Sequence, residues 1–319
     1  MPQSPQSPQS PRSPRSQQSR QPLASPRAGQ ADGAAPGARS ATPPARRFAD
    51  ARIAAVISDI DGTLLTPDKQ VTARAVAAVQ ALRDAGIVFT LASSRPPVGL
   101  AGLVKQLHLD APLAAFNGGT LVAPDLRTVL HARHIAPELA KQALRALDAH
   151  GHHAWVFARG EWRVTDPSGP YIDLESRTIG TGPTVVARFD DLDAVDKIVG
   201  VSRDFEALAR SEASLRTRFG STLNVARSQK YYLDLTDPAA NKGEAVHGLA
   251  RQLNLPCSRI AVLGDMANDV PMFEAAGLSV AMGQAAPDVQ AAADDVTAAN
   301  DDDGFAKAIE RWLGIDKTA

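Results

Sequence analysis

Two carboxylates, two positions apart, carry the clearest chemical signal in this sequence. Asp59 and Asp61 lie in the run DIDGT, directly after the apolar segment 53–57. In open parallel sheets, ligand sites lie at the carboxyl ends of strands, and Gly62 permits a tight turn there. Because close carboxylates repel each other unless a cation or a shared proton intervenes, the pair suits a bound Mg²⁺. An ordinary strand-to-turn junction is the alternative, since Asp and Gly both favour turns.

Two further polar positions fit a phosphate site. Ser93 follows the apolar segment 87–91, and its hydroxyl could face a phosphate or simply cap a helix. Lys242 lies where a helix is expected to begin after a loop. A lysine there is either solvated or neutralises the charge of a phosphoryl group during its transfer.

More carboxylates follow a third apolar segment, 260–263. Asp265 and Asp269 stand four residues apart in the run GDMAND, which also contains Asn268. Hard oxygen ligands in this number suit Mg²⁺, and the absence of a Cys/His cluster in the sequence argues against zinc. The single cysteine, Cys257, excludes an internal disulfide framework and fits a reducing compartment, so we expect a cytoplasmic protein.

The elements that must position these residues alternate between strand and helix. This order predicts an α/β fold with a parallel sheet and helices on both faces. Strands are expected at 53–57, 87–91, 113–116, 231–235, 260–263 and 278–281, and helices at 72–85, 97–107, 242–253 and 305–313, with a short helix between the last two strands.

The middle of the chain has a different texture, with helices expected at 136–149 and 204–219 among short strands. We interpret it as an inserted α+β domain. The predicted division is a disordered Pro/Ser/Arg-rich tail at 1–47, the first part of the sheet domain at 48–119, the insertion at 120–226 and the second part at 227–319.

Charge is distributed unevenly along the chain. Seven arginines against one aspartate give residues 1–47 a net charge of +6, so the remainder carries −7 of the chain's total of −1. An acidic body argues against nucleic acid as the main partner. No apolar run approaches the roughly 20 residues needed to span a membrane.

Together, DxDGTL at 59–64, Ser93, Lys242 and GDxxND at 264–269 resemble the haloacid dehalogenase-like superfamily of phosphohydrolases. The resemblance is closest to the Cof-type branch, in which a type IIB cap is inserted between the second and third motifs. It covers about 53–314 and implies a Rossmann-like core with an inserted α+β cap.

The resemblance also implies roles. Asp59 matches the nucleophile that attacks phosphorus and forms an aspartyl-phosphate, and Asp61 the general acid and base. Ser93 matches the phosphate-binding hydroxyl and Lys242 the lysine that stabilises charge. Asn268 matches a residue that contacts the phosphoryl group or orients the nucleophile.

The metal implied by the resemblance is Mg²⁺. Its ligands would be the Asp59 carboxylate, the Asp61 backbone carbonyl and Asp265, with Asp269 binding directly or through water.

The implied function is removal of phosphate from a small phosphorylated metabolite, such as a sugar phosphate or a phosphorylated cofactor. A phosphomutase or disaccharide-phosphate phosphatase on the same scaffold is the nearest alternative, and a non-catalytic binding module that uses the basic tail is a remote one. Substrate and oligomeric state stay open. Candidate substrate contacts in the insertion, each with a structural explanation that we favour, are His152, His153, Arg159, Trp162, Tyr171 and Arg227.

Overall fold

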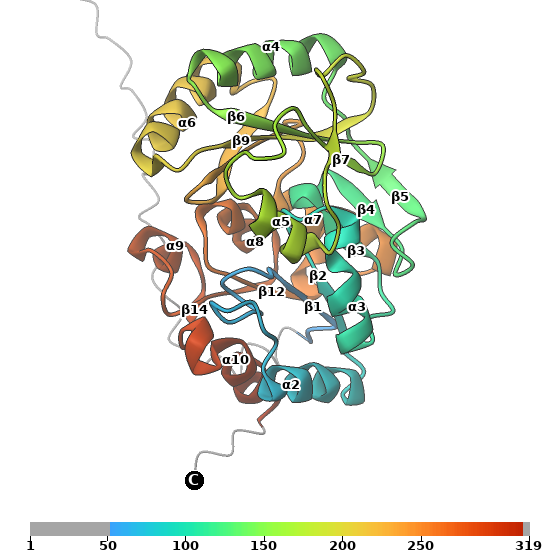
Figure 1. The fold of residues 1–319 in the computed structure, drawn as a ribbon. Coiled ribbons are helices and arrows are strands. Elements are labelled where there is room, and N and C mark those ends of the chain that lie inside the picture. Colours follow the sequence, from blue (N-terminus) through green and yellow to red (C-terminus); the bar gives the residue numbers. More distant parts are fainter. Residues whose placement is uncertain (1–51, 315–319) are drawn as a thin grey trace, which may run out of the picture. The chain divides into compact units, whose positions relative to one another are not determined.

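The strands that precede Asp59, Ser93 and Asp265 belong to one parallel sheet (Figure 1). The structure, a computed structural model, describes residues 52–314. The sheet has the strand order β14-β13-β12-β1-β2. Its strands are β1 (Ala55–Ser58), β2 (Val88–Leu91), β12 (Ile260–Gly264), β13 (Leu278–Ala281) and β14 (Asp295–Val296).

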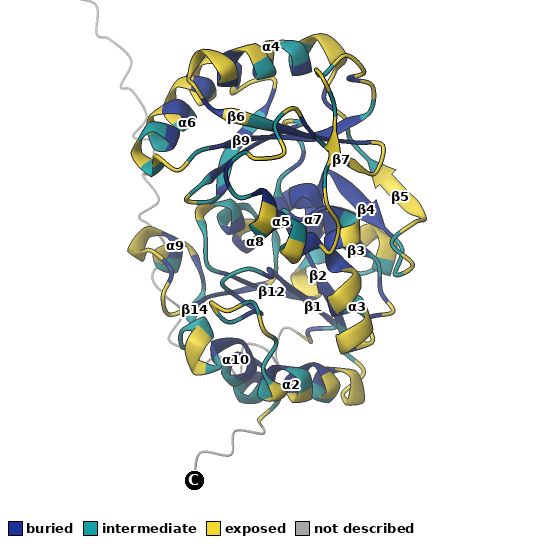
Figure 2. Cartoon of the chain, in the orientation of Figure 1, coloured by how far each residue is buried: buried dark blue, intermediate teal, exposed yellow. Residues whose placement is uncertain are grey.

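The central strands are apolar along their whole length because both faces of the sheet are covered. Every residue of β1, β12 and β13 is buried, as the dark ribbons of Figure 2 show. In the register of β1 and β12, Ser58 lies opposite Leu263. Asp59 and the loop after Gly264 therefore leave the sheet at the same edge.

Helices cover the two faces of this sheet. Leu82 and Ile309, from two helices on one face, belong to one apolar cluster, and Leu249 and Phe273, on the other face, belong to a second. The helices are α2 (Ala73–Asp84), α3 (Ala101–Leu107), α7 (Lys242–Leu253), α8 (Val270–Ala275), α9 (Pro287–Ala292) and α10 (Gly304–Leu313). The expected α/β class and parallel sheet are confirmed.

The start of α7 is fixed by its N-cap. The side chain of Asn241 accepts the backbone N–H of Glu244, which satisfies one of the free donors at the helix start. Lys242 is consequently the first helical residue.

A second sheet, of six strands, occupies most of the predicted insertion. Its order is β10-β11-β9-β6-β7-β8, and it is antiparallel except at β7–β8. The strands are β6 (His153–Ala158), β7 (Glu161–Val164), β8 (Thr184–Val185), β9 (Val195–Val201), β10 (Asn224–Gln229) and β11 (Tyr232–Thr236). The helices α4 (Pro137–Ala149) and α6 (Phe205–Phe219) share an apolar cluster with it, and α5 (Ile172–Ile179) lies between β7 and β8 in the chain.

One strand lies in a different sheet from the one that its sequence neighbours indicate. The strand expected at 231–235 precedes a helix and a buried strand, so the alternating pattern assigned it to the parallel sheet. In the structure β11 pairs with β10 and β9 instead. The predicted domain boundary after residue 226 falls inside β10, and we propose that the inserted domain extends to about Thr236.

Three short strands connect the two larger sheets. Of these, β3 (Leu113–Ala115), β4 (Thr120–Val122) and β5 (Val129–Ala132) form an antiparallel sheet, and Ala114 makes a parallel bridge to Ala92. The elements α5, α9 and β14, which are short, are not among those predicted from the sequence. The predicted tail, 1–47, lies outside the described residues. No helix within 52–314 is long and apolar enough to cross a membrane.

Candidate active site

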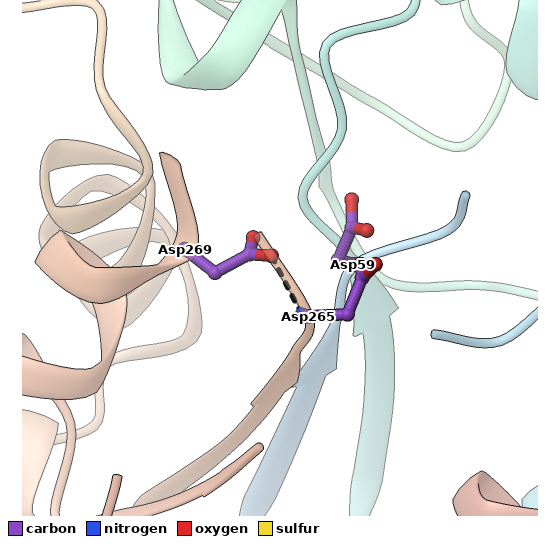
Figure 3. A group of neighbouring side chains, drawn as sticks. All are labelled: Asp59, Asp265 and Asp269. Atoms are coloured by element: carbon purple, nitrogen blue, oxygen red, sulfur yellow. Dashed lines mark hydrogen bonds between the residues drawn. The ribbon is translucent and has the colours of Figure 1, made fainter. Parts of the chain in front are cut away.

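Three aspartates converge where β1 and β12 end (Figure 3). Asp59, Asp265 and Asp269 each offer a carboxylate oxygen, and these oxygens lie within 4.8 Å of one another. Asp59 and Asp269 are buried, and Asp265 is partly buried. The sequence separates Asp59 from the other two by about two hundred residues, and the pairing of two parallel strands brings them together.

Lys242 bridges two of these carboxylates. Its side chain is only 1 % exposed, and its Nζ donates to Asp59 Oδ1 and Asp269 Oδ1, at 2.5 Å in each case. Burial alone lowers the pKa of Lys242, but the two aspartates raise it more, so the net shift is upward. The lysine is therefore a fixed positive charge beside the predicted nucleophile.

Asp269 holds the loop and the lysine rather than facing an open position. Its Oδ2 accepts the backbone N–H groups of Asp265 and Met266, both at 2.9 Å, and its Oδ1 accepts Lys242. Both oxygens are thus occupied by protein donors. This geometry fits contact with a metal through water better than direct ligation.

The surroundings of Asp59 and Asp265 fit a divalent cation. Burial raises the pKa of Asp59 to about 6, with Lys242 opposing and Asp269 adding to the rise. Burial, Asp59 and Asp269 raise the pKa of Asp265 to about 8. Thr63 Oγ1 also donates to Asp265 Oδ1, at 3.2 Å. Carboxylates that repel each other in this way are oxygen donors of the kind that Mg²⁺ binds.

Asp61 belongs to a separate ion-pair network beside this group. Arg95 donates from Nε to Asp61 Oδ2 and from Nη2 to Oδ1, both at 2.7 Å, and Lys69 Nζ donates to Oδ1 at 2.6 Å. Burial raises the pKa of Asp61, but Arg95 and then Lys69 lower it more, to about 2. Asp61 is therefore ionised in this structure.

The two remaining predicted residues lie at the same edge. Ser93 is buried, and its Oγ accepts the backbone N–H of Arg95 at 3.2 Å. Asn268 donates from Nδ2 to Asn117 Oδ1 at 3.2 Å, and its own Oδ1 is buried without a hydrogen-bond partner. This unpartnered oxygen can accept a hydrogen bond from an incoming donor, and Asn268 lines the same pocket as Lys242.

A small polar cavity lies over Asp61, between the parallel-sheet domain and the inserted domain. Its volume is about 40 Å³, and Asp61, Arg95 and Lys69 line it on one side. The inserted domain contributes Glu175, Lys197 and four residues of the segment around β10 and β11, namely Ser228, Gln229, Tyr231 and Tyr232.

Most of the insertion residues singled out from sequence have structural partners. Trp162 packs on Trp155, and Tyr171 stacks on Tyr231. His152 bonds to Ser211, Arg159 pairs with Asp191 and Asp193, Arg227 pairs with Glu212, and His153 faces Asp166. Sequence reasoning missed Arg95, Lys69, Glu175 and Lys197. Only Arg95 had a usable signal, since it follows Ser93 by two positions.

Gly62 is required by its close approach to Asp265. Its φ is +96°, and a Cβ there would lie 2.3 Å from Asp265 Oδ2. Gly62→Ala is expected to displace that carboxylate and to weaken Mg²⁺ binding about 10- to 100-fold, measured by titration calorimetry. Gly86→Ala is the control, because Gly86 also has positive φ (+71°) but a Cβ there meets nothing within 4 Å. Equal Mg²⁺ affinity in the two variants would contradict this account.

Comparison with known proteins identifies the family of this chain. Residues 56–309 match the family model of haloacid dehalogenase-like hydrolases. A 5-amino-6-(5-phospho-D-ribitylamino)uracil phosphatase, YcsE of Bacillus subtilis, is 26% identical over 83% of this chain and 97% of its own. The pyridoxal phosphate phosphatase YbhA of Escherichia coli is 27% identical over 80% of this chain and 97% of its own.

A solved haloacid dehalogenase-like hydrolase from Bacteroides thetaiotaomicron has the same fold. It is 26% identical, has a TM-score of 0.72, and the match covers 81% of this chain and 99% of that one. The family model spans both parts of the parallel-sheet domain and the inserted domain between them. The resemblance predicted from the motifs is confirmed, and the chain belongs to the haloacid dehalogenase-like hydrolases.

Proposed function

We propose that this protein is a Mg²⁺-dependent phosphatase that removes phosphate from a small phosphorylated metabolite through an aspartyl-phosphate at Asp59. The reaction class is that of a phosphoric monoester hydrolase. The observation that carries the proposal is the placement of Asp59, a buried carboxylate at a strand end that shares Lys242 with Asp269 and lies against Asp265.

In the first step a carboxylate oxygen of Asp59 bonds to phosphorus while the bond from phosphorus to the ester oxygen breaks. The leaving alkoxide takes a proton from Asp61. In the second step water gives a proton to Asp61 and attacks phosphorus, which breaks the bond to Asp59 and releases inorganic phosphate. Lys242 stabilises the negative charge of the phosphoryl group throughout.

Asp61 lies in its base form in the structure. Arg95 and Lys69 hold it ionised, which suits the second step. The first step needs a proton on Asp61. An entering phosphate competes with Asp61 for Arg95 and Lys69. When these cations bind the phosphate instead, the pKa of Asp61 rises and it can take up a proton.

Asp59 and Asp265, with the backbone carbonyl of Asp61, are the proposed Mg²⁺ ligands, and Asp269 takes part through water. When bound, the ion neutralises phosphate oxygens and orients phosphorus for attack. Ser93 and Asn268 are proposed phosphate contacts. The two named relatives act on different compounds by their names, so they support a small phosphorylated metabolite as the class. We also propose a cytoplasmic location, with no nucleic acid as main partner.

The direct test is phosphate release from a panel of sugar phosphates and phosphorylated cofactors. Release is expected with Mg²⁺ and is expected to stop with excess EDTA and return when Mg²⁺ is restored. The proposal fails if no ester releases phosphate with Mg²⁺, or if release is indifferent to EDTA. An isomerised sugar phosphate in place of inorganic phosphate would assign a mutase.

The loss of activity caused by Asp61→Asn is expected to depend on the leaving group of the substrate. An alkoxide needs a proton as it leaves, whereas p-nitrophenolate is stable without one. We expect kcat/KM, which reports the steps up to release of the alcohol and not the shared second step, to fall about 100- to 10,000-fold for an alkyl phosphate. For p-nitrophenyl phosphate, the loss is expected to be at least about 10-fold smaller. Equal losses for the two esters would show that Asp61 is not the acid of the first step.

A further inference from the structure

Two charged residues of the inserted domain face the cavity above Asp61. Glu175 comes from α5 and Lys197 from β9, and both line the cavity together with Arg95. They are buried, at 8 % and 4 % exposure. Charged side chains of this length are rarely buried unless they are paired.

Lys197 is fixed at the boundary between the two domains. Its Nζ donates to the backbone oxygen of Ser94 at 2.9 Å and to Asp234 Oδ2 at 3.4 Å. The ammonium also lies over the rings of Phe116 and Phe157, at 5.9 and 5.2 Å from their centroids. It is held beside the loop that carries Ser93 and thus close to the phosphate site.

Glu175 is an uncommitted acceptor in the same cavity. Its Oε2 accepts the hydroxyl of Tyr232 at 3.2 Å, and within the described part of the chain no ion pair neutralises it. Burial raises its pKa, and the charges of Lys197 and Arg95 oppose that rise. The carboxylate faces both cations without a direct contact to either.

We propose that Glu175 and Lys197 determine specificity by binding hydroxyl groups of the leaving alcohol, and that the substrate is a phosphorylated polyol or open-chain sugar. This inference rests on the proposed phosphatase function and names its substrate class. Asp234 is a positioning residue, because it is 2 % exposed, does not line the cavity and holds the ammonium of Lys197.

A hydroxyl group matches this pair because it donates to a carboxylate and accepts from an ammonium at the same time. An apolar leaving group would offer no donor to the Glu175 carboxylate and no acceptor to the remaining N–H of the Lys197 ammonium. A second phosphate would meet the carboxylate of Glu175. A flat aromatic group would need a free ring to stack on, but Tyr231 already stacks on Tyr171, with ring centroids 4.4 Å apart.

The test compares ribitol 5-phosphate with pentyl phosphate, which has the same chain length and no hydroxyl groups. In the wild type with Mg²⁺, we expect kcat/KM to be about 100-fold higher for ribitol 5-phosphate. In Glu175→Met and in Lys197→Met, this preference is expected to shrink to below about 10-fold. The smaller preference is expected to come from a lower kcat/KM for ribitol 5-phosphate, because each variant removes a contact to its hydroxyl groups.

Asp191→Asn is the control, since Asp191 belongs to the inserted domain, pairs with Arg159 on its surface and does not line the cavity. It is expected to keep the preference. Asp234→Asn is expected to raise KM for ribitol 5-phosphate while leaving kcat for pentyl phosphate unchanged.

Two results would overturn the substrate class and leave the phosphatase function standing. One is a parallel loss on both esters in the Glu175 and Lys197 variants, or no loss in either. The other is a wild type that hydrolyses p-nitrophenyl phosphate or pyridoxal phosphate but prefers pentyl phosphate to ribitol 5-phosphate. A wild type that releases phosphate from none of these esters would overturn the proposed function itself.

Discussion

Asp59→Asn is expected to abolish phosphate release, with kcat lowered by about 10,000-fold or more. An amide oxygen is a poor nucleophile, and the substitution also removes a carboxylate from the proposed metal site. The buried neighbours Lys242 and Asp265 keep their places because asparagine has the same shape. Phosphate release from the best substrate of the panel, under single-turnover and steady-state conditions, measures the loss.

The same substitution is expected to leave the protein at least as stable as the wild type in Mg²⁺-free buffer at pH 7.5. Asp59 has its pKa raised to about 6, chiefly by burial, so the folded state binds this proton more tightly than the unfolded state. Its charge therefore lowers stability increasingly from about pH 4 to pH 6 and fully above that range. Tm of Asp59→Asn and of the wild type, measured at pH 7.5 and pH 4, is expected to show higher stability of the variant at the higher pH only.

Asp68→Asn is the matched control, since Asp68 is an exposed aspartate in the same loop. It is expected to keep wild-type activity. If Asp59→Asn also keeps its activity, Asp59 is not the nucleophile. If it loses activity only because Tm drops well below that of the wild type, the loss reports unfolding instead of chemistry.

Lys242→Met is expected to damage stability and catalysis together. The lysine is the bridge between Asp59 and Asp269, and methionine removes its charge without filling the site with a donor. Breaking a buried ion pair by removing one partner costs about 3–5 kcal/mol of unfolding free energy. We expect kcat to fall about 100- to 1,000-fold, because charge on the phosphoryl group loses a fixed stabiliser.

Urea unfolding with and without Mg²⁺ measures the loss of unfolding free energy in Lys242→Met. The divalent ion binds the repelling carboxylates, so it is expected to restore more stability to Lys242→Met than it adds to the wild type. Lys307→Met is the control, because Lys307 is partly exposed and pairs with the surface residue Asp302; it is expected to cost less than about 1 kcal/mol. Similar unfolding free energies for the two variants would refute the bridging role.

The sequence predicted those site residues that follow a buried strand or start a helix. Asp59 and Asp265 follow β1 and β12, which are continuous apolar runs, and Lys242 follows the N-cap Asn241. These are local patterns that a reader of the sequence can detect. The roles assigned to the residues stay predictions, although the structure brings Asp59, Lys242, Asp265 and Asp269 together.

Other parts of the site depend on distant contacts that leave no local pattern. Glu175 and Lys197 look like ordinary surface charges in sequence, and only the packing of α5 and β9 against the parallel-sheet domain buries them. The occupied oxygens of Asp269 follow from a turn at Asp265 and Met266. Strand β11 was assigned to the wrong sheet because an apolar strand before a helix has the same sequence pattern in both domains.

The cavity above Asp61 has a volume of about 40 Å³, which is space for roughly three water molecules at about 10–15 Å³ each. A sugar phosphate is larger than this space, so its leaving group can enter the cavity above Asp61 only while the inserted domain has moved away. The apparent second-order rate constant is then the intrinsic one multiplied by the fraction of time that the entrance is open. Inorganic phosphate leaves under the same restriction. Turnover of a readily cleaved ester can thus be limited by opening, on a timescale of microseconds to milliseconds, and substrates with very different leaving groups then share one maximal rate.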